Sequence, residues 1–330
     1  MKVAIYSIKP FEQVYIEQSN NKKHELSFIK EALSVETASL AQDCEAISVF
    51  TNDDVSSKVL DKLNNLGVRH VAVRAAGYDQ VDLKKAAELK LNIANVPEYS
   101  PYAIAEYTIA MILAMNRKII RADHQVKDFN FSLDELIGFD LHGKTVGIIG
   151  VGKIGAITAK ILHGFGCTIL GVDIHPNPEL TEKYNLRYTS LEELYRESDI
   201  ISIHAPLTPD TRYLINKSTL SQMKTGVMIV NTSRGALLNT SDAIDALKEG
   251  KIGYLGLDVY EKEKGLFFYD HSNEVMKDDL LSRLLTFKNV LVTGHQAFLT
   301  ANALKNIADA TIYNLDCWHK GEVSKYELIK

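Results

Sequence analysis

The sequence predicts an α/β protein built on doubly wound parallel sheets, and three observations indicate this class. Short apolar segments rich in β-branched residues alternate with segments of helical periodicity along most of the chain. A glycine-rich turn at residues 150–155 joins one of these predicted strands directly to a helix. With 330 residues, the chain is long enough for two domains that each bury a core.

The first part of the chain, residues 1–99, alternates strands and helices but contains no glycine fingerprint. We expect strands at residues 3–6, 46–50, 70–73 and 92–96, and helices at residues 56–66 and 82–90. The small residues of the turn at 75–79 leave backbone N–H groups open to an anion. The proline-punctuated segment 96–101 precedes a long predicted helix near 103–117, and we interpret it as a hinge between domains. Ordinary loop chemistry is the alternative for both turns.

Residues 145–156 carry the pattern of a dinucleotide-binding turn. The apolar run 145–149 predicts a buried parallel strand, and Gly150, Gly152 and Gly155 follow it before a helical segment. Gly150 permits the tight turn, Gly152 lets a pyrophosphate approach the backbone, and Gly155 lets the helix pack on the strand. The N-terminus of the helix adds partial positive charge that favours a phosphate.

The next predicted strand, residues 168–173, ends in a carboxylate. Asp173 stands about 20 residues beyond the glycines, where such folds place an acid on the ribose 2′-hydroxyl of the adenosine. The acid disfavours a 2′-phosphate, and no arginine follows in residues 174–176, so the sequence favours NAD over NADP. The alternative is an ordinary βαβ unit with a glycine turn, and the joint presence of strand, helix and acid argues against it.

Composition excludes several classes of function. The chain is 46% hydrophobic and 24% charged, as in ordinary globular proteins. A net charge of −5 without any basic block argues against nucleic acid and anionic membranes as partners. No apolar run is long enough to span a bilayer, and the N-terminus begins with a predicted strand rather than a signal peptide. Cys44, Cys167 and Cys317 lack C-x-x-C spacing and fit packing roles in a reducing cytoplasm.

Polar residues follow four of the strands in the second part of the chain. We expect these strands at residues 199–203, 227–231, 254–259 and 289–293, and helices at 191–197, 218–224, 241–250 and 301–320. The polar residues are His204, Arg234, Glu263 and His295. Ligands of open α/β sheets bind beyond the carboxyl ends of strands, so we expect these side chains at one edge. Each of them alone is more readily explained as a structural or solvated side chain.

Together these residue types supply what hydride transfer to a 2-oxo acid requires. Arginine can hold a carboxylate and polarise a carbonyl, and histidine can pass a proton to the developing alkoxide. A neighbouring glutamate stabilises the imidazolium. The scattered histidines lack the spacing of a metal site, and Ser233 lacks the glycine pattern of a nucleophile elbow.

The joint motif set resembles the D-isomer-specific 2-hydroxyacid dehydrogenases almost from end to end. The motifs are Gly150–Gly155 with Asp173, Val230-Asn-Thr-Ser-Arg-Gly235, Leu257-Asp-Val-Tyr-Glu-Lys-Glu263 and Thr293-Gly-His-Gln-Ala-Phe298. Within that family, residues 74–79, 130–133, 231–237 and 294–300 most resemble fermentative bacterial D-lactate dehydrogenases. The resemblance implies reduction of pyruvate by NADH to D-lactate in the cytoplasm.

The resemblance also implies roles for individual residues. Arg234 would bind the substrate, Glu263 would pair with the histidine, and His295 would be the acid/base. Ala76 and Gly77 would offer backbone N–H groups to the substrate carboxylate, and Tyr99 and Phe298 would line the substrate side. Asp258 would border the nicotinamide. The implied NAD contacts are Gly150, Gly152, Lys153, Ile154, Gly155, Asp173, His204, Ala205, Pro206, Thr211, Thr232, Ser233, Arg234 and Asp258.

The family organisation implies two Rossmann-like domains. The catalytic domain would comprise residues 1–99 and 299–330, with the NAD-binding domain, residues 100–298, inserted between them. Closure of the two would exclude water from the hydride path. The family forms homodimers or tetramers, usually through the nucleotide domain. The long helix after Pro101 is a candidate contact, although its apolar face fits a core position equally well.

Two departures from the family pattern leave alternatives open. Gly294 precedes the histidine where many relatives carry proline, and Val55 stands where some relatives have an aromatic substrate contact. A bulkier 2-oxo acid, such as phenylpyruvate or 2-oxoisocaproate, is therefore a second possible substrate. A non-catalytic NAD(H)-sensing protein is a third possibility, against which the joint presence of Arg234, Glu263 and His295 argues.

Overall fold

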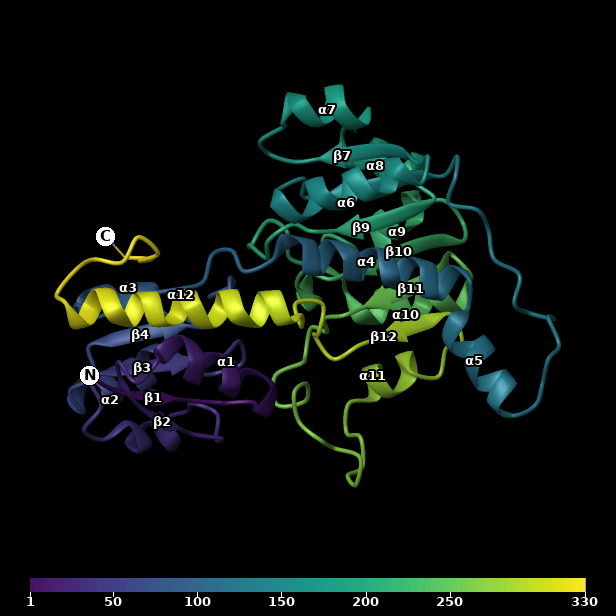
Figure 1. Ribbon diagram of the computed structural model, residues 1–330. Coiled ribbons are helices and arrows are strands. Elements are labelled where there is room, and N and C mark those ends of the chain that lie inside the picture. Colours follow the sequence, from purple (N-terminus) through teal and green to yellow (C-terminus); the bar gives the residue numbers. More distant parts are fainter. Residues whose placement is uncertain (330) are drawn as a thin grey trace. The chain divides into compact units, whose positions relative to one another are not determined.

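The structure, a computed structural model, describes residues 1–329 and divides into two compact units. Unit 1 combines Met1–Ser100 with the segment that begins at Leu299, and unit 2 is Pro101–Phe298. Each unit carries its own sheet, and every pair of named strands is parallel (Figure 1). These two α/β sheets confirm the predicted fold class.

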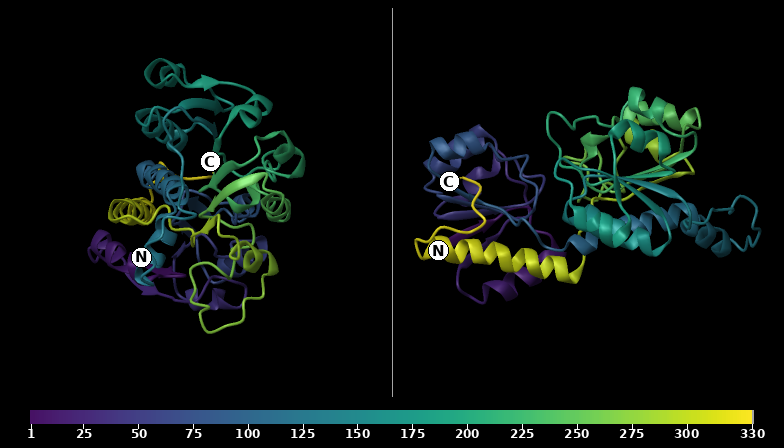
Figure 2. Two further views of the ribbon diagram at one scale, coloured as in Figure 1. Left: turned by 90° about the vertical axis from the view of Figure 1, so that its right-hand side faces the viewer. Right: turned by 90° about the horizontal axis from the view of Figure 1, so that it is seen from above.

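Unit 1 has a five-stranded sheet in the order β2-β1-β3-β4-β5. Its strands are β1 (Lys2–Ile5), β2 (Glu25–Phe28), β3 (Ala46–Val49), β4 (His70–Val73) and β5 (Asn92–Ala94). Helices α1 (Pro10–Asn20) and α12 (Ala301–His319) cover one face. The other face is covered by η1 (Thr37–Ala41), α2 (Ser57–Asn65) and α3 (Leu83–Glu88). Figure 2 shows α12, in yellow, running alongside this sheet.

Unit 2 has a seven-stranded sheet in the order β12-β11-β10-β9-β6-β7-β8. The strands are β6 (Thr145–Ile149), β7 (Thr168–Val172), β8 (Arg187–Tyr188), β9 (Ile200–Ile203), β10 (Val227–Asn231), β11 (Ile252–Leu257) and β12 (Val290–Val292). The first strand of the unit, β6, lies between β7 and β9, so the strand order reverses there. Open α/β sheets bind ligands at the carboxyl edge beside such a reversal.

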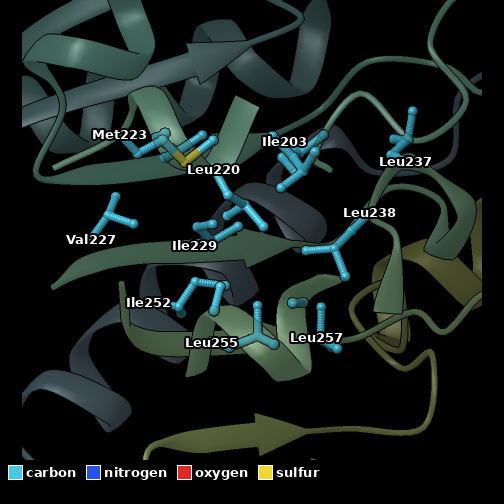
Figure 3. Close-up of a cluster of buried hydrophobic side chains, with 14 of the residues drawn as sticks. Ile203, Leu220, Met223, Val227, Ile229, Leu237, Leu238, Ile252, Leu255 and Leu257 are labelled. Atoms are coloured by element: carbon cyan, nitrogen blue, oxygen red, sulfur yellow. The ribbon is translucent and has the colours of Figure 1, made fainter. Parts of the chain in front are cut away.

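Helices cover both faces of the unit 2 sheet. One face carries α4 (Pro101–Asn116), α6 (Lys153–Gly164) and α7 (Pro178–Tyr184). The other carries α8 (Leu191–Glu197), α9 (Lys217–Gln222), α10 (Thr240–Lys248) and α11 (Asp279–Leu284). Within β10, Ile229 points into the core of Figure 3, whereas Met228 and Val230 point into the opposite core. Burial on both faces explains why these strands are continuous apolar runs.

One helix, α5 (Ile119–Lys127), contributes no buried residue to unit 2. The segment that follows it swings out from the body of the unit before the chain returns to β6 (Figure 1). Within residues 1–329, no helix combines the length and the apolar composition that crossing a bilayer requires.

Candidate active site

The glycine turn between β6 and α6 is packed against the loop that follows β9. Gly150 has a left-handed φ of +89°, and a Cβ there would lie 2.5 Å from the Ala205 nitrogen. A Cβ on Gly155 would collide with the carbonyl oxygen of Gly150. Both glycines are therefore required by the packing of the chain itself.

Gly152 is different, because its backbone is extended and no described atom lies within 4 Å of an added Cβ. The open space lies where α6 begins with Lys153 and Ile154. Backbone N–H groups and the partial positive charge of a helix N-terminus favour a phosphate at such a position. The turn thus fits the pyrophosphate of a dinucleotide.

The carboxylate of Asp173 lies beside this turn. It follows β7, and its Oδ2 accepts a hydrogen bond from the Val151 N–H at 2.6 Å. Its Oδ1 accepts from the His175 N–H at 2.8 Å. The acid therefore stands at the carboxyl edge of the sheet next to the glycines, as its spacing predicted.

The loops after β9 and β10 are joined to each other at the same edge. The Ser233 hydroxyl donates to the Ala205 carbonyl at 2.7 Å, and Ala205 in turn packs on Gly150. Thr211 Oγ1 donates to the Pro206 carbonyl at 2.7 Å and so closes the loop after β9. The hydroxyl of Thr232 is 2.9 Å from that of Thr108 on α4. These loop residues and the glycine turn gather around the point where the strand order reverses.

His204 directly follows β9 and is held as a neutral imidazole. Its Nε2 is 2.8 Å from the Ser202 hydroxyl. Burial of the ring lowers the pKa of His204 to about 4. At neutral pH this histidine is therefore uncharged and cannot serve as a proton donor.

The turn that carries Arg234 is shaped by a buried asparagine. Asn231 is fully buried at the end of β10; its Oδ1 accepts from the Ser233 N–H at 3.0 Å. Its Nδ2 donates to the Arg234 carbonyl at 2.9 Å. A Cβ on Gly235 would collide with the backbone of Tyr260. The Arg234 turn therefore packs directly against the loop that follows β11.

That loop carries Glu263, which pairs with His295. Nδ1 of His295 is 2.9 Å from Oε1 of Glu263, and both side chains are 16% exposed. The ring of Phe268 lies beside the imidazole, with 5.7 Å between ring centroids. A carboxylate only accepts, so Nδ1 carries a proton and Nε2 is the nitrogen left to face a substrate.

His295 has a left-handed backbone, with φ of 55°, which is uncommon for a residue other than glycine. Asp258 stabilises this conformation, because its carbonyl accepts from the His295 N–H at 2.7 Å. Its carboxylate accepts from the N–H groups of Gln296 at 2.9 Å and Ala297 at 2.8 Å. The Thr293 hydroxyl also donates to it, at 2.6 Å. Asp258 has no exposed surface, so the structure makes it an anchor of the His295 loop rather than a residue that touches a ligand.

Three contacts at the carboxyl edge of the sheet were missed by the sequence analysis. The Gln296 amide donates to the Tyr107 hydroxyl at 2.8 Å, Thr108 meets Thr232, and Phe268 lies beside His295. Burial raises the pKa of Tyr107. Only the Gln296 contact had a signal in the sequence, namely the position of Gln296 directly after the histidine. Tyr107 and Thr108 belong to a helix whose sequence reads as core packing, so no pattern marked them.

The turn expected to bind a carboxylate lies in unit 1, after β4. The Ala75 carbonyl accepts from the Val96 N–H at 3.1 Å, and the Ala76 carbonyl accepts from Asn95 Nδ2 at 2.8 Å. Within residues 1–329, no group accepts a hydrogen bond from the N–H of Ala76 or Gly77. This arrangement leaves both N–H groups available to an anion.

The remaining candidates fall in both units. Tyr99 belongs to unit 1, where its carbonyl accepts from Asn306 on α12 at 2.6 Å, and Phe298 is the last residue of unit 2. Val55 is fully buried in the core of unit 1, paired with Val81, and lines no open surface. Among residues 1–329, no group of three or more His, Cys, Asp or Glu side chains could hold a metal ion.

Comparison with known proteins identifies the family. Residues 109–297 match the model of the D-isomer specific 2-hydroxyacid dehydrogenase NAD-binding domain. The chain is 48% identical over 330 residues to the D-lactate dehydrogenase of Escherichia coli, with 100% of both chains covered. It is 51% identical over 324 residues to a 2-hydroxyacid dehydrogenase homolog of Haemophilus influenzae, with 98% of both covered.

Solved structures give the same result for the fold. The structure of apo D-lactate dehydrogenase from Escherichia coli superposes with a TM-score of 0.90 at 46% identity, covering 100% of both chains. The sequence, the fold and the geometry at the carboxyl edge of the sheet thus indicate the same family. The chain belongs to the D-isomer-specific 2-hydroxyacid dehydrogenases, oxidoreductases with NAD as cofactor, and contains that family's NAD-binding domain.

Proposed function

We propose that this protein is an NAD-dependent D-lactate dehydrogenase that reduces pyruvate with NADH to D-lactate. The observation that carries the proposal is the hydrogen bond between His295 and Glu263, 2.9 Å long, at the carboxyl edge of the sheet. It lies in a chain whose full length matches a relative named D-lactate dehydrogenase. The full burial of Val55 supports pyruvate over a bulkier 2-oxo acid, because this side chain offers no surface to a substrate.

In this proposal His295 moves the proton. Glu263 holds Nδ1, so the imidazolium presents the Nε2 proton to the carbonyl oxygen at C2 of pyruvate. NADH, when bound, supplies the hydride that reaches C2. The carbonyl oxygen takes the Nε2 proton and becomes the hydroxyl of lactate, and His295 is left neutral. Glu263 favours the charged ring at the start of the step.

Arg234 and the unit 1 turn bind the substrate in this proposal. The guanidinium of Arg234 holds the carboxylate and polarises the carbonyl. The N–H groups of Ala76 and Gly77 take the remaining carboxylate oxygen, and Tyr99 and Phe298 line the substrate side. Asp258 acts by holding the His295 loop.

NAD contacts come from the residues gathered at the carboxyl edge of unit 2. Gly152, Lys153 and Ile154 hold the pyrophosphate at the start of α6, and Asp173 holds the adenosine ribose. The other proposed contacts are Gly150, Gly155, His204, Ala205, Pro206, Thr211, Thr232, Ser233 and Arg234.

A panel of 2-oxo acids with NADH and NADPH tests the proposed function. We expect the highest kcat/KM with pyruvate and NADH, and D-lactate as the product on chiral chromatography. A higher kcat/KM with phenylpyruvate or 2-oxoisocaproate would assign a bulkier substrate. Production of L-lactate, or binding of NADH without turnover of any 2-oxo acid, would contradict the proposal.

We also propose that the protein forms a homo-oligomer, a dimer or tetramer, through α5 and the segment after it. Helix α4, the contact considered from the sequence, packs in the core instead. In contrast, Phe129 is 84% and Leu133 78% exposed. A groove of about 790 Å³, lined in part by Met115 and Tyr254, lies beside α5. Large exposed apolar side chains next to an apolar groove favour a self-complementary interface.

Sedimentation velocity tests this interface. Phe129→Asp combined with Leu133→Asp should lower the sedimentation coefficient, because charges at a buried contact oppose association. The control is Val275→Asp, at an 85% exposed site elsewhere in unit 2, which should leave the assembly intact. Equal sedimentation of both variants and the unchanged protein would exclude this surface.

We place the reaction in the cytoplasm, where it would regenerate NAD during fermentation. Cys44, Cys167 and Cys317 are buried thiols that form no disulfide, which supports a reducing compartment. Fractionation of cells that produce the protein, followed by an assay of pyruvate reduction, checks this location. Activity confined to an extracytoplasmic fraction would contradict it.

A further inference from the structure

The turn after β4 is aimed by hydrogen bonds to its carbonyl groups. In a trans peptide, the C=O of one residue and the N–H of the next point in opposite directions. The Val96 N–H holds the Ala75 carbonyl at 3.1 Å and so fixes the direction of the Ala76 N–H. Asn95 Nδ2 holds the Ala76 carbonyl at 2.8 Å and so fixes the direction of the Gly77 N–H.

Asn95 is itself held in place by a series of buried hydrogen bonds that involves Asn314 and Ser324. Its backbone carbonyl accepts from Asn314 Nδ2 on α12 at 3.1 Å. The Oδ1 of Asn314 accepts from the Ser324 hydroxyl at 2.6 Å. Asn314 and Ser324 are both buried, and Asn95 is 4% exposed. Because buried amides are costly to leave unpaired, this series of hydrogen bonds favours one arrangement of the three side chains.

The C-terminal segment fixes the far end of the chain of hydrogen bonds. It runs antiparallel along β5, where Ala94 pairs with Glu327. The Leu328 N–H donates to the Ile93 carbonyl at 2.8 Å. Asn95 thus ties the turn after β4 to α12 and to the C-terminal segment, because its side chain binds Ala76 and its backbone carbonyl binds Asn314.

We infer that Asn95 is a positioning residue for the substrate carboxylate, and that Asn314 and Ser324 support it. The inference rests on the proposed function, in which the Ala76 and Gly77 N–H groups bind that carboxylate. Asn95 is too deeply buried to touch a substrate, so it acts by aiming the Gly77 N–H. The interaction is made with pyruvate and with the transition state alike, so its loss affects KM more than kcat.

Substitution of Asn95 tests the inference. Asn95→Ala frees the peptide between Ala76 and Gly77, and we expect KM for pyruvate to rise about tenfold while kcat changes less. Asn95→Asp places a carboxylate against the Ala76 carbonyl and should raise KM further. The dissociation constant of NADH, measured by fluorescence, should be unchanged, because the proposed cofactor contacts lie in unit 2. Ser324→Ala should raise KM in the same direction by a smaller factor.

Asn20→Ala is the matched control. Asn20 is 6% exposed and its Nδ2 donates to the His24 carbonyl at 2.9 Å, at the opposite edge of the same sheet. This variant should lose a comparable amount of thermal stability while KM stays unchanged. The contrast separates loss of stability in unit 1 from misalignment of the turn.

The two levels of the proposal fail in different ways. No turnover of pyruvate by the unchanged protein would overturn the proposed function and the inference with it. An active protein whose KM is unchanged in Asn95→Ala, or rises equally in Asn20→Ala, would overturn the inference alone. If Asn95→Ala does not fold, Ser324→Ala decides, and an unchanged KM in that variant contradicts the inference.

Discussion

Two histidines follow strands of the same sheet, and their surroundings give them different chemistry. His204 follows β9, bonds to the Ser202 hydroxyl and has its pKa lowered to about 4 by burial. His295 follows β12 and bonds to the carboxylate of Glu263. A hydroxyl does little to offset the cost of charging a buried ring, whereas a carboxylate favours the charged form. Burial without a charged partner therefore keeps His204 neutral, whereas His295 has the acidic partner that a proton carrier requires.

The backbones of the two histidines also differ, because that of His204 continues a strand whereas that of His295 is left-handed. The N–H of His204 donates to the Ile149 carbonyl at 2.7 Å and simply extends the pairing of β9 with β6. His295 is in the left-handed region and depends on Asp258 to remain there. Strained backbone held by surrounding groups is typical of functional sites. The sheet thus supports His204, while a dedicated anchor presents His295.

The largest predicted effect separates these two residues directly. His295→Asn should lower kcat for pyruvate reduction by about 10²–10⁴-fold, because the variant lacks a general acid. His204→Asn should change the KM for NADH rather than kcat. Steady-state kinetics of both variants measures the contrast. If kcat falls equally in both, the assignment of the proton to His295 is wrong.

A second test compares two glycines of the turn after β6. Gly150 is required by its packing against the loop that carries His204, and in the proposed function Gly152 is required by the cofactor. A Cβ at Gly152 meets no described atom, so Gly152→Ala should fold normally yet weaken NADH binding by about tenfold or more. Gly150→Ala should destabilise the protein, because the new Cβ strikes Ala205 beside His204. Calorimetry for stability and fluorescence titration for NADH check both expectations. Unchanged NADH affinity in Gly152→Ala would place the pyrophosphate elsewhere.

Much of this edge could be predicted from the sequence, because it depends on strand ends and local spacing. The strands at 145–149 and 227–231 match β6 and β10 residue for residue, and Glu263 and His295 meet as expected. Asp258 as an anchor of the His295 loop could not be predicted, since its hydrogen bonds join two separate loops.

Helix α1 shows a second reason why sequence patterns fail. Its buried residues are Glu12, Ile16 and Asn20, so an apolar periodicity is absent. Glu12 can be buried because Arg74, also buried, binds both of its carboxylate oxygens, at 3.0 and 3.1 Å. Such a pair between distant residues leaves no local pattern. Helix α5 fails for the opposite reason, because its apolar residues are exposed.

A third prediction tests the carboxylate that distinguishes His295 from His204. Glu263→Gln keeps an acceptor for Nδ1 but removes the negative charge, so the imidazolium is less stabilised. Pyruvate reduction requires the protonated ring, and its alkaline decline should therefore move to lower pH. We expect kcat/KM near neutral pH to fall about tenfold. The control is Glu261→Gln, two residues earlier in the same loop. Identical pH profiles in all three proteins would remove Glu263 from the mechanism.

The smallest predicted effect is the contribution of His204 to the pH dependence of stability. Its pKa is lowered from 6.5 to about 4 in the folded protein. Between these values the unfolded chain binds a proton that the folded chain does not, so acid favours unfolding over that range. His204→Asn cannot take up this proton and can still bond to the Ser202 hydroxyl.

Calorimetry at two pH values measures the effect. The decrease in Tm from about pH 7 to about pH 5 should be smaller in His204→Asn than in the unchanged protein, by a few degrees. His175→Asn, at an exposed position of the same unit, is the control and should keep the full decrease. If His204→Asn also keeps the full decrease, His204 is protonated in the folded state, and the contrast with His295 no longer rests on charge.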